Sequence, residues 1–193
     1  MANIAVFGGT FNPFHIGHYQ MLECVCGLDI IDRVLLMPDK IPPHKTCDFL
    51  ADNADRIKMC ELVCKDFYKA ELCLIEFERE GKSYSADTIK LLKTKYPSDK
   101  FYMVIGGDML ATLDTWYKWQ ELIIDTAFIA FDRDGMDNFE HHIKRMQHLG
   151  AEIIAVDKKI ISVSSTQLRE NLNKNLLPEK VYNYIIKKGI YNE

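Results

Sequence analysis

The chain has 193 residues, of which 48% are hydrophobic and 27% charged, and this balance is ordinary for a globular domain with a full core. The formal net charge of -4 argues against a general nucleic-acid binder, which usually carries a basic face. No segment approaches the roughly 18 consecutive apolar residues of a membrane span, and no signal peptide precedes the first apolar run. We therefore expect one cytoplasmic domain over residues 1–193, with neither a nucleic acid nor a membrane as partner.

Short apolar runs alternate with helix-like segments along the chain. Most runs are continuously apolar, as in strands covered on both faces, and they lie at residues 3–8, 33–38, 72–77, 101–106, 127–131 and 152–156. Helix-like segments lie between them at residues 16–27, 53–67, 85–96, 109–124 and 137–149. Asp137 and Gly150 are expected to cap the fifth helix, and Pro178 and Gly189 to bracket a C-terminal one.

This alternation predicts an α/β fold. We expect a doubly wound parallel sheet of the Rossmann-like kind, with helices on both faces and a short helical segment at the C-terminus. In such folds the ligand binds at the carboxyl ends of the strands, where the strand order reverses.

The stretch IAVFGGTFNPFHIGHYQ, residues 4–20, connects the first strand to the first helix. Gly8 and Gly9 end the strand, where glycine permits a positive φ and lets a ligand approach the backbone closely. The helix begins near Ile16, so its N–H groups and the positive end of its dipole face the turn and favour an anion. His15 and His18 are three residues apart and share one face of the first helical turn. The pattern indicates a phosphate site.

Two other interpretations of the histidines stay open on these residues alone. The GxGxxG fingerprint and the GK[ST] ending of the phosphate loop are both absent from the sequence, so neither supports the phosphate interpretation. A zinc site would need further ligands, for which His44 is the nearby histidine. The two histidines could also be ordinary polar residues at a helix start.

The six cysteines contain no CxxC pair. Cys60 and Cys64 are one helical turn apart and could be a ligand pair. They also lie on an apolar stripe with Ile57, Val63 and Phe67, and a free cysteine packs like a small hydrophobic residue. We expect reduced, structural thiols.

The stretch GGTFNPFHIGH resembles the GxFxPxHxGH signature of the nucleotidyltransferase superfamily. Further motifs extend the resemblance over nearly the whole chain: PDKIPPHK (38–45), SYSADT (83–88), GGDML (106–110), TWYKW (115–119) and SVSSTQLR (162–169). In this order they are similar to the motifs of the bacterial nicotinate-nucleotide adenylyltransferase family. Four departures occur, namely Asn12 in place of aspartate, Ser85 in place of threonine, Val163 in place of isoleucine, and DRDG (132–135) without the usual proline.

The resemblance implies that ATP and nicotinate mononucleotide are converted to nicotinate adenine dinucleotide and pyrophosphate, a reaction of NAD biosynthesis. The mononucleotide phosphate is already an anion and attacks the α-phosphorus of ATP in line, so no general base is needed. Catalysis then consists of positioning and charge stabilisation. Mg²⁺ is expected to enter with ATP and to have few protein ligands. The implied partners are these two small molecules, and assembly into a homo-oligomer stays open.

The resemblance also assigns residues to each role. The expected catalytic residues are His15, His18, Lys45 and Arg169. ATP is expected to contact these histidines, Arg169, and residues Gly8, Gly9, Thr10, Phe11, Gly106, Asp108, Ser164 and Ser165. Nicotinate mononucleotide is expected to contact Thr10, His44, Lys45, Ser85, Trp116 and Tyr117.

Some of these residues have a structural role as an alternative or in addition. Trp116 is expected to stack on the pyridine ring, whereas Trp119 is expected to serve the core. Ser85 and Ser164 are also expected to cap the helices that follow them, the latter in a capping box with Gln167.

Other functions are compatible with part of this pattern. The nearest alternative is an adenylyltransferase for the amide mononucleotide, or for both mononucleotides. TWYKW and SYSADT argue against a phosphopantetheine adenylyltransferase or a cytidylyltransferase. A non-catalytic nucleotide sensor on the same fold should have lost a histidine or the arginine of the last motif, and this chain keeps them.

Overall fold

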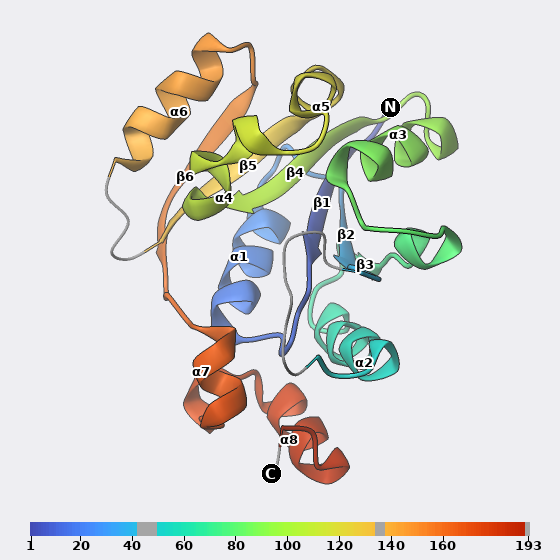
Figure 1. Ribbon diagram of the computed structural model, residues 1–193, viewed down its shortest axis with the longest axis vertical. Coiled ribbons are helices and arrows are strands. Elements are labelled where there is room, and N and C mark those ends of the chain that lie inside the picture. Colours follow the sequence, from blue (N-terminus) through green and yellow to red (C-terminus); the bar gives the residue numbers. More distant parts are fainter. Residues whose placement is uncertain (42–49, 134–137, 192–193) are drawn as a thin grey trace.

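The computed structural model describes residues 1–41, 50–133 and 138–191. Its centre is a six-stranded sheet in the order β3-β2-β1-β4-β5-β6, in which every pair of neighbours is parallel (Figure 1). The strands are β1 (Asn3–Gly9), β2 (Arg33–Pro38), β3 (Ala70–Leu72), β4 (Lys100–Gly106), β5 (Ala127–Arg133) and β6 (Ile153–Ile160). The strand order reverses between β1 and β4, so the predicted doubly wound sheet is confirmed.

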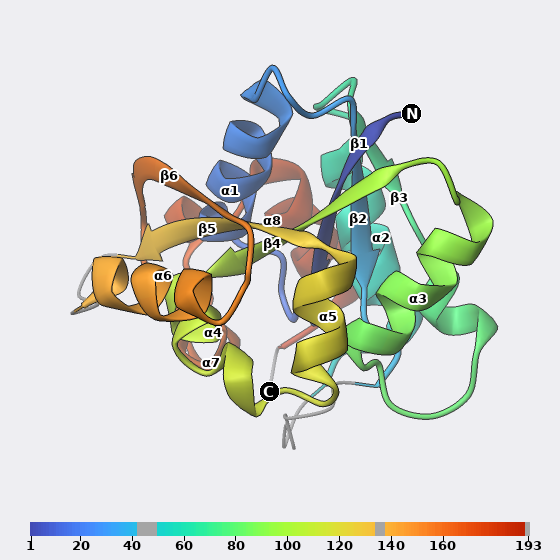
Figure 2. The same cartoon turned by 90° about the horizontal axis from the view of Figure 1, so that it is seen from above.

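Helices cover both faces of this sheet, as the sequence predicts (Figure 2). One face carries α1 (Ile16–Gly27) and α2 (Asn53–Cys64). The opposite face carries α3 (Ser85–Lys95), α4 (Gly107–Ala111), α5 (Trp119–Asp125) and α6 (Phe139–His148). The C-terminal segment contains α7 (Ser165–Glu170) and α8 (Glu179–Lys188), whose apolar side chains join the core on the α1 side.

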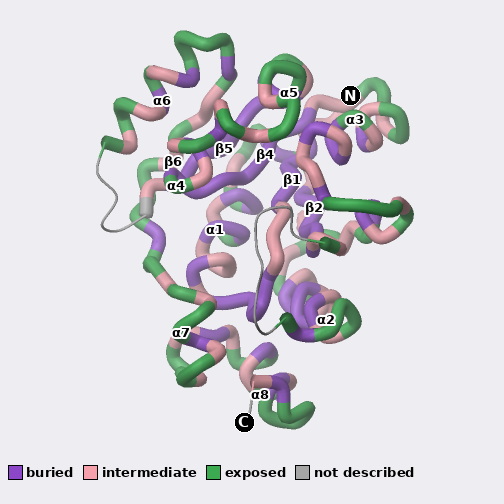
Figure 3. Tube along the Cα trace, in the orientation of Figure 1, coloured by how far each residue is buried: buried purple, intermediate pink, exposed green. Residues whose placement is uncertain are grey.

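The sheet separates two hydrophobic cores. Successive side chains of a strand point to opposite faces, so Ala5 and Phe7 of β1 enter the core beneath α1 and α2, whereas Ile4 and Val6 enter the other. All four are at most 3% exposed. The central strands are therefore buried along their length, while the outer faces of the helices meet solvent (Figure 3). This burial explains why the strand sequences are continuously apolar.

Two predicted elements are wrong in extent. The apolar run at 72–77 is not one strand, because β3 ends at Leu72 and residues 75–78 form a short 3₁₀ helix. Ile75 belongs to this 3₁₀ helix and its side chain is buried in the core. The apolar residue is therefore buried, as expected for a strand, but its backbone has a different conformation. The predicted helix at 109–124 is divided into α4, a 3₁₀ turn at 113–115, and α5. Extended backbone at Trp116 and a left-handed Lys118 (φ 52°) interrupt it.

The ends of several elements also differ from the prediction. The last strand continues to Ile160 through exposed, polar residues of an edge strand, which the apolar run at 152–156 does not reveal. Helix α2 ends at Cys64 and not at residue 67. The predicted cap Asp137 lies outside the described residues, and Asn138 precedes α6 without a side-chain cap. Gly189 ends α8 with a φ of 66°, as predicted.

None of the helices in the described part of the chain is long and apolar enough to cross a membrane.

Candidate active site

A large cavity lies at the carboxyl ends of the central strands, where the strand order reverses. Its volume is about 1310 Å³, above the range of roughly 300–1,000 Å³ that is usual for one small ligand. The ends of β1 and β4 and the beginnings of α1, α3, α4 and α7 supply its wall. Residues as distant in the chain as Gly8, Gly106 and Arg169 therefore surround one space. The predicted position of the ligand site agrees with this cavity.

The turn after β1 differs from the prediction in one respect. Gly8 and Gly9 still belong to β1, and the positive φ of the turn is at Phe11, with a value of 48°. A non-glycine residue in this region is strained, so the surrounding structure must hold it in place. A Cβ atom on Gly9 would approach the Phe11 ring to 3.0 Å. Glycine at position 9 therefore makes room for the Phe11 ring, and the bend itself occurs two residues later.

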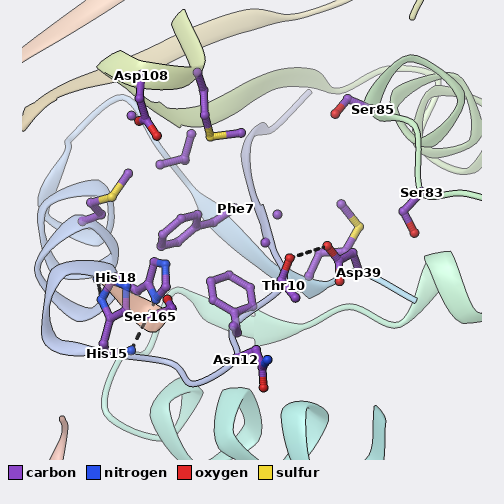
Figure 4. Close-up of a pocket in the computed structure, with 18 of the residues that line it drawn as sticks. Phe7, Thr10, Asn12, His15, His18, Asp39, Ser83, Ser85, Asp108 and Ser165 are labelled. Atoms are coloured by element: carbon purple, nitrogen blue, oxygen red, sulfur yellow. Dashed lines mark hydrogen bonds between the residues drawn. The ribbon is translucent and has the colours of Figure 1, made fainter. Parts of the chain in front are cut away.

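His15 and His18 hold each other at the start of α1. The N–H of His18 donates to Nδ1 of His15, and the N–H of His15 donates to Nδ1 of His18, both at 3.3 Å. The two rings stack with their centroids 3.6 Å apart (Figure 4). Because Nδ1 accepts a hydrogen bond in each ring, the proton of the neutral imidazole is on Nε2. Each histidine thus has an Nε2–H donor, and both residues line the cavity.

Three phenylalanine rings pack around His18. The centroid of its imidazole lies 5.1 Å from that of Phe11, 5.3 Å from Phe14 and 6.3 Å from Phe7. These three rings are buried, with at most 3% of their surface exposed. The imidazole is therefore fixed by a reciprocal cap on one side and by aromatic packing on the other, which limits its rotation.

Gly17 lets α1 approach the chain that leads into α7. A Cβ atom at position 17 would lie 2.8 Å from the carbonyl oxygen of Ile161, which is too close for a real side chain. Only glycine allows this contact without a shift of backbone. Gly17, which lies between the two histidines in the sequence, thus allows them to lie next to Ser165, the first residue of α7 (Figure 4).

Asn12 connects the same turn to the C-terminal segment. Its Oδ1 accepts from the N–H of Ala51 at 3.1 Å and from the hydroxyl of Tyr191 at 2.6 Å. Its backbone carbonyl accepts from Nη1 of Arg169 at 3.0 Å, and Nη2 of Arg169 donates to Thr166 at 3.0 Å. Burial raises the pKa of the Tyr191 phenol, which keeps this hydroxyl protonated as a donor. The asparagine that departs from the family pattern is therefore a buried structural acceptor.

The opposite side of the cavity is built differently. Ser83 and Ser85 lie there, across from the histidines (Figure 4). The rings of Tyr84 and Tyr117 are in contact, with centroids 4.5 Å apart, and Tyr117 is 46% exposed. The open turn around Tyr117 leaves an aromatic surface that faces both the cavity and solvent.

The two predicted serine caps have different outcomes. Ser164 caps α7, because its hydroxyl oxygen accepts from the N–H of Gln167 at 3.3 Å. Ser85 is the first residue within α3, and the N-cap Tyr84 makes no side-chain capping bond. The hydroxyl of Ser85 is therefore not a helix cap, and Ser85 lines the cavity.

Most predicted site residues meet in this cavity. Its lining includes Gly8, Gly9, Thr10, Phe11, His15, His18, Ser85, Gly106, Asp108, Trp116, Tyr117, Ser165 and Arg169. Ser164 does not line it and acts as the cap of α7. His44 and Lys45 lie outside the described residues. Trp119 packs against the core, as expected.

Sequence reasoning missed several residues of the wall, among them Asp39, Glu76, Ser83, Thr88 and Tyr191. Asp39 lies in the motif PDKIPPHK, directly after a strand, and Ser83 lies in SYSADT, just before a helix. Both positions are typical of site residues in this kind of fold. Glu76 follows the misassigned third strand, and nothing in the sequence distinguishes Tyr191.

Neither the cysteines nor a metal cluster contributes to the site among the described residues. The five described cysteines are free thiols, and Cys47 lies outside this part. Burial raises the pKa of the Cys26 thiol to about 11 and that of Cys64 to about 12, so both are poor nucleophiles. Residues 1–41, 50–133 and 138–191 contain no group of three or more side chains that could hold a metal. Cys26 and Cys60 are buried, as expected for structural thiols.

Comparisons with known proteins agree with this fold and site. The family model described as cytidylyltransferase-like matches residues 6–171. The chain therefore belongs to the cytidylyltransferase-like family of nucleotidyltransferases.

Relatives that match over nearly their full length show to which group of nucleotidyltransferases the chain belongs. The nicotinate-nucleotide adenylyltransferase of Bacillus subtilis is 37% identical, with 99% of each chain covered. A probable nicotinate-nucleotide adenylyltransferase of Lactococcus lactis is also 37% identical, over 98% of this chain and 95% of its own. Within the family, the chain belongs to the nicotinate-nucleotide adenylyltransferases.

Solved structures confirm the fold. The nicotinic acid mononucleotide adenylyltransferase of Plasmodium falciparum, complexed with APC, superposes with a TM-score of 0.81 at 22% identity. The comparison covers 100% of this chain and 98% of that one, and the same protein is also known complexed with NaAD.

Proposed function

We propose that this protein transfers the adenylyl group of ATP to nicotinate mononucleotide, giving nicotinate adenine dinucleotide and pyrophosphate in NAD biosynthesis. The observation that carries the proposal is the reciprocal pair of His15 and His18 at the start of α1, because both residues line a cavity large enough for two nucleotides. The activity named for the full-length relatives points to the same reaction.

The reaction needs one bond to form and one to break. A phosphate oxygen of the mononucleotide attacks the α-phosphorus of ATP, and the bond from that phosphorus to the β-phosphate bridging oxygen breaks. Pyrophosphate leaves with the electron pair. Because the attacking oxygen is already anionic, the protein supplies orientation and charge stabilisation, not a base.

We assign His18 to the α-phosphate and His15 to the triphosphate, as neutral imidazoles that donate from Nε2. Arg169 is assigned to the leaving pyrophosphate, with Lys45 and the chain at Ser164–Ser165. The guanidinium of Arg169 has five N–H donors, and its bonds to Asn12 and Thr166 orient it while the others serve phosphate oxygens. Gly106 and Asp108, at the end of β4, are assigned to the adenosine.

The mononucleotide is assigned to the side of Ser85, Trp116 and Tyr117, with Thr10 near its phosphate. His44 and Lys45 belong to this assignment on the ground of resemblance. The nicotinate carboxylate would accept hydrogen bonds from the Ser85 hydroxyl and from backbone N–H groups at the start of α3. This part of the cavity also decides between acid and amide.

Mg²⁺ fits this site as an ion that enters with ATP. Among the described residues, the cavity wall carries isolated carboxylates, such as Asp108, and no cluster of three ligands. Magnesium usually keeps several waters and binds through one or two carboxylates and substrate phosphates, and it would neutralise the triphosphate.

We further propose that residues 1–193 act as one catalytic domain in the cytoplasm.

Pyrophosphate release tests the proposal. The purified protein is incubated with ATP and Mg²⁺, once with nicotinate mononucleotide and once with the amide mononucleotide. We expect rapid turnover with the acid and little with the amide. Comparable rates would keep the chemistry and replace the proposed selectivity by dual specificity, and no release with either mononucleotide would overturn the substrate assignment.

A further inference from the structure

Arg56 of α2 is a buried arginine next to the site but outside its lining. Its residue surface is 0% exposed, and it is among the largest fully buried side chains of the described chain. A charged side chain is almost never buried completely unless it is paired, because removal from water is costly. The complete burial of this charge is therefore not explained by the packing of α2 alone.

The guanidinium joins three segments that meet at the cavity. Its Nη1 donates to the carbonyl oxygen of Thr10 at 2.8 Å and to Oδ1 of Asp39 at 3.0 Å. Its Nη2 donates to the carbonyl oxygen of Asp39 at 2.8 Å and to Oδ1 of Asn53. The hydroxyl of Thr10 donates in turn to Oδ2 of Asp39 at 2.9 Å, as Figure 4 shows. Thr10 and Asp39 both line the cavity.

The bond to Thr10 fixes the direction of the next peptide. In a planar trans peptide the carbonyl and the following N–H point in opposite directions. The Thr10 carbonyl points to Arg56, so the N–H of Phe11 points away from Arg56. Thr10 and Phe11 both line the cavity. Phe11 has a φ of 48°, a strained conformation that persists only where neighbouring groups enforce it.

We propose that Arg56 is a positioning residue for adenylyl transfer. Its guanidinium holds the Thr10–Phe11 peptide and Asp39 so that the Phe11 N–H faces the phosphates of the bound nucleotides. This inference rests on the proposed function. Lysine at position 56 would keep the positive charge, but a single ammonium lacks the planar fork that reaches two carbonyl oxygens and two side-chain oxygens together.

The test compares Arg56→Lys with the wild type and with Arg33→Lys as a matched control. Arg33 forms an exposed ion pair with Glu71 at the far end of β2 and does not line the cavity. Pyrophosphate release is measured with ATP and nicotinate mononucleotide at a temperature where melting curves show all three proteins to be folded. We expect Arg56→Lys to lower kcat about 10- to 100-fold with less than about a threefold change in either KM, because misplaced groups reduce turnover more than binding. Arg33→Lys should stay within twofold of the wild type, as expected for a surface pair.

A second measurement reads the backbone directly. The amide resonance of Phe11 is followed by NMR while Mg²⁺-ATP is added to each protein. We expect a shift in the wild type and in Arg33→Lys, and its loss or reduction in Arg56→Lys.

These outcomes separate the inference from the proposed function. A folded Arg56→Lys variant with wild-type kcat, or activity lost only in proportion to unfolding, overturns the positioning role. If the wild type releases no pyrophosphate, the proposed function fails, and the positioning role of Arg56 is then judged from the Phe11 resonance alone. If Mg²⁺-ATP causes no shift of that resonance in the wild type, the positioning role is overturned.

Discussion

The two sides of the cavity differ in how far their characteristic groups are exposed to solvent. On the side of α1 and α7, Asn12 is 3% exposed, His15 5% and Arg56 0%, and each makes at least two hydrogen bonds to separate parts of the chain or to its histidine partner. On the side of α3, Thr88 is buried and its hydroxyl donates to Glu76 at 2.7 Å, but the aromatic surface is open: Tyr117 is 46% exposed and contacts Tyr84 through ring packing.

This difference matches the two tasks of a nucleotidyltransferase. Charge that develops on phosphate is stabilised best by donors that are already in place, because reorganisation during the reaction costs free energy. Recognition of a flat ring needs an apolar surface that a ligand can reach from solvent. We therefore expect substitutions on the first side to reduce kcat and those on the second to raise a KM.

The largest effect is expected for His18→Ala, which removes a donor from the side of α1 and α7. We expect kcat for pyrophosphate release to fall about 10²–10³-fold, as for other preorganised donors. His148→Ala, on an exposed position of α6, is the control and should be silent. Since three phenylalanine rings pack on His18, a melting curve must show that the variant is folded. Near-full activity would make the assigned role wrong.

Gly17→Ala tests whether the arrangement of this side depends on close backbone contact. The added Cβ lies 2.8 Å from the Ile161 carbonyl, so α1 or the chain before α7 must move. We expect a loss of about 1–3 kcal/mol in the free energy of unfolding, measured by urea, together with lower activity. Gly27→Ala at the other end of α1 meets nothing within 4 Å and should be neutral or slightly stabilising. Equal effects at both positions would contradict the contact.

Trp116→Ala addresses the recognition side. We expect KM for nicotinate mononucleotide to rise about tenfold with kcat changed less than about threefold, because stacking on the ring is the same in ground and transition states. Trp119→Ala is the matched control, since both tryptophans pack against the same core but Trp119 does not line the cavity, so its loss should lower stability without a specific effect on that KM. A fall in kcat alone for Trp116→Ala would remove the distinction between the two sides.

The smallest effect concerns a thiol outside both sides. Burial raises the pKa of Cys64 to about 12, above the ordinary thiol value of about 8.5. Below that ordinary value both folded and unfolded chains are protonated and stability is complete. As pH rises toward 12 the unfolded chain loses its proton first, so stability falls, by less than about 1 kcal/mol per pH unit. Urea midpoints from pH 7 to 11 should decline less steeply for Cys64→Ala than for the wild type, and identical slopes would exclude this thiol as a cause.

Local patterns predicted much of the fold. Helix α1 was predicted at its observed bounds, and the continuously apolar strands indicated a parallel sheet covered on both faces. The misassignments lie where an apolar residue can be buried from more than one backbone conformation. Ile75 reaches the core from a 3₁₀ turn, and Trp116 occupies an extended break between two helices, so neither apolar pattern fixed the local conformation.

The candidate site was predictable where chemistry and spacing occur together in a short stretch. His15 and His18 share one helical turn, and the SST motif begins a helix; both follow from spacing and capping, which are local properties. The sequence therefore determined which residues bear the donors and at which end of the sheet they lie.

Only the tertiary structure decided how these donors are held. Arg56, Asn12 and Tyr191 are separated by many residues, and each forms a hydrogen bond to a segment distant in the chain. Such bonds depend on the packing of whole helices against the sheet, which no spacing in the sequence encodes. The same holds for the contact at Gly17, where a carbonyl 144 positions later determines that only glycine fits, because two backbones meet there without room for a side chain.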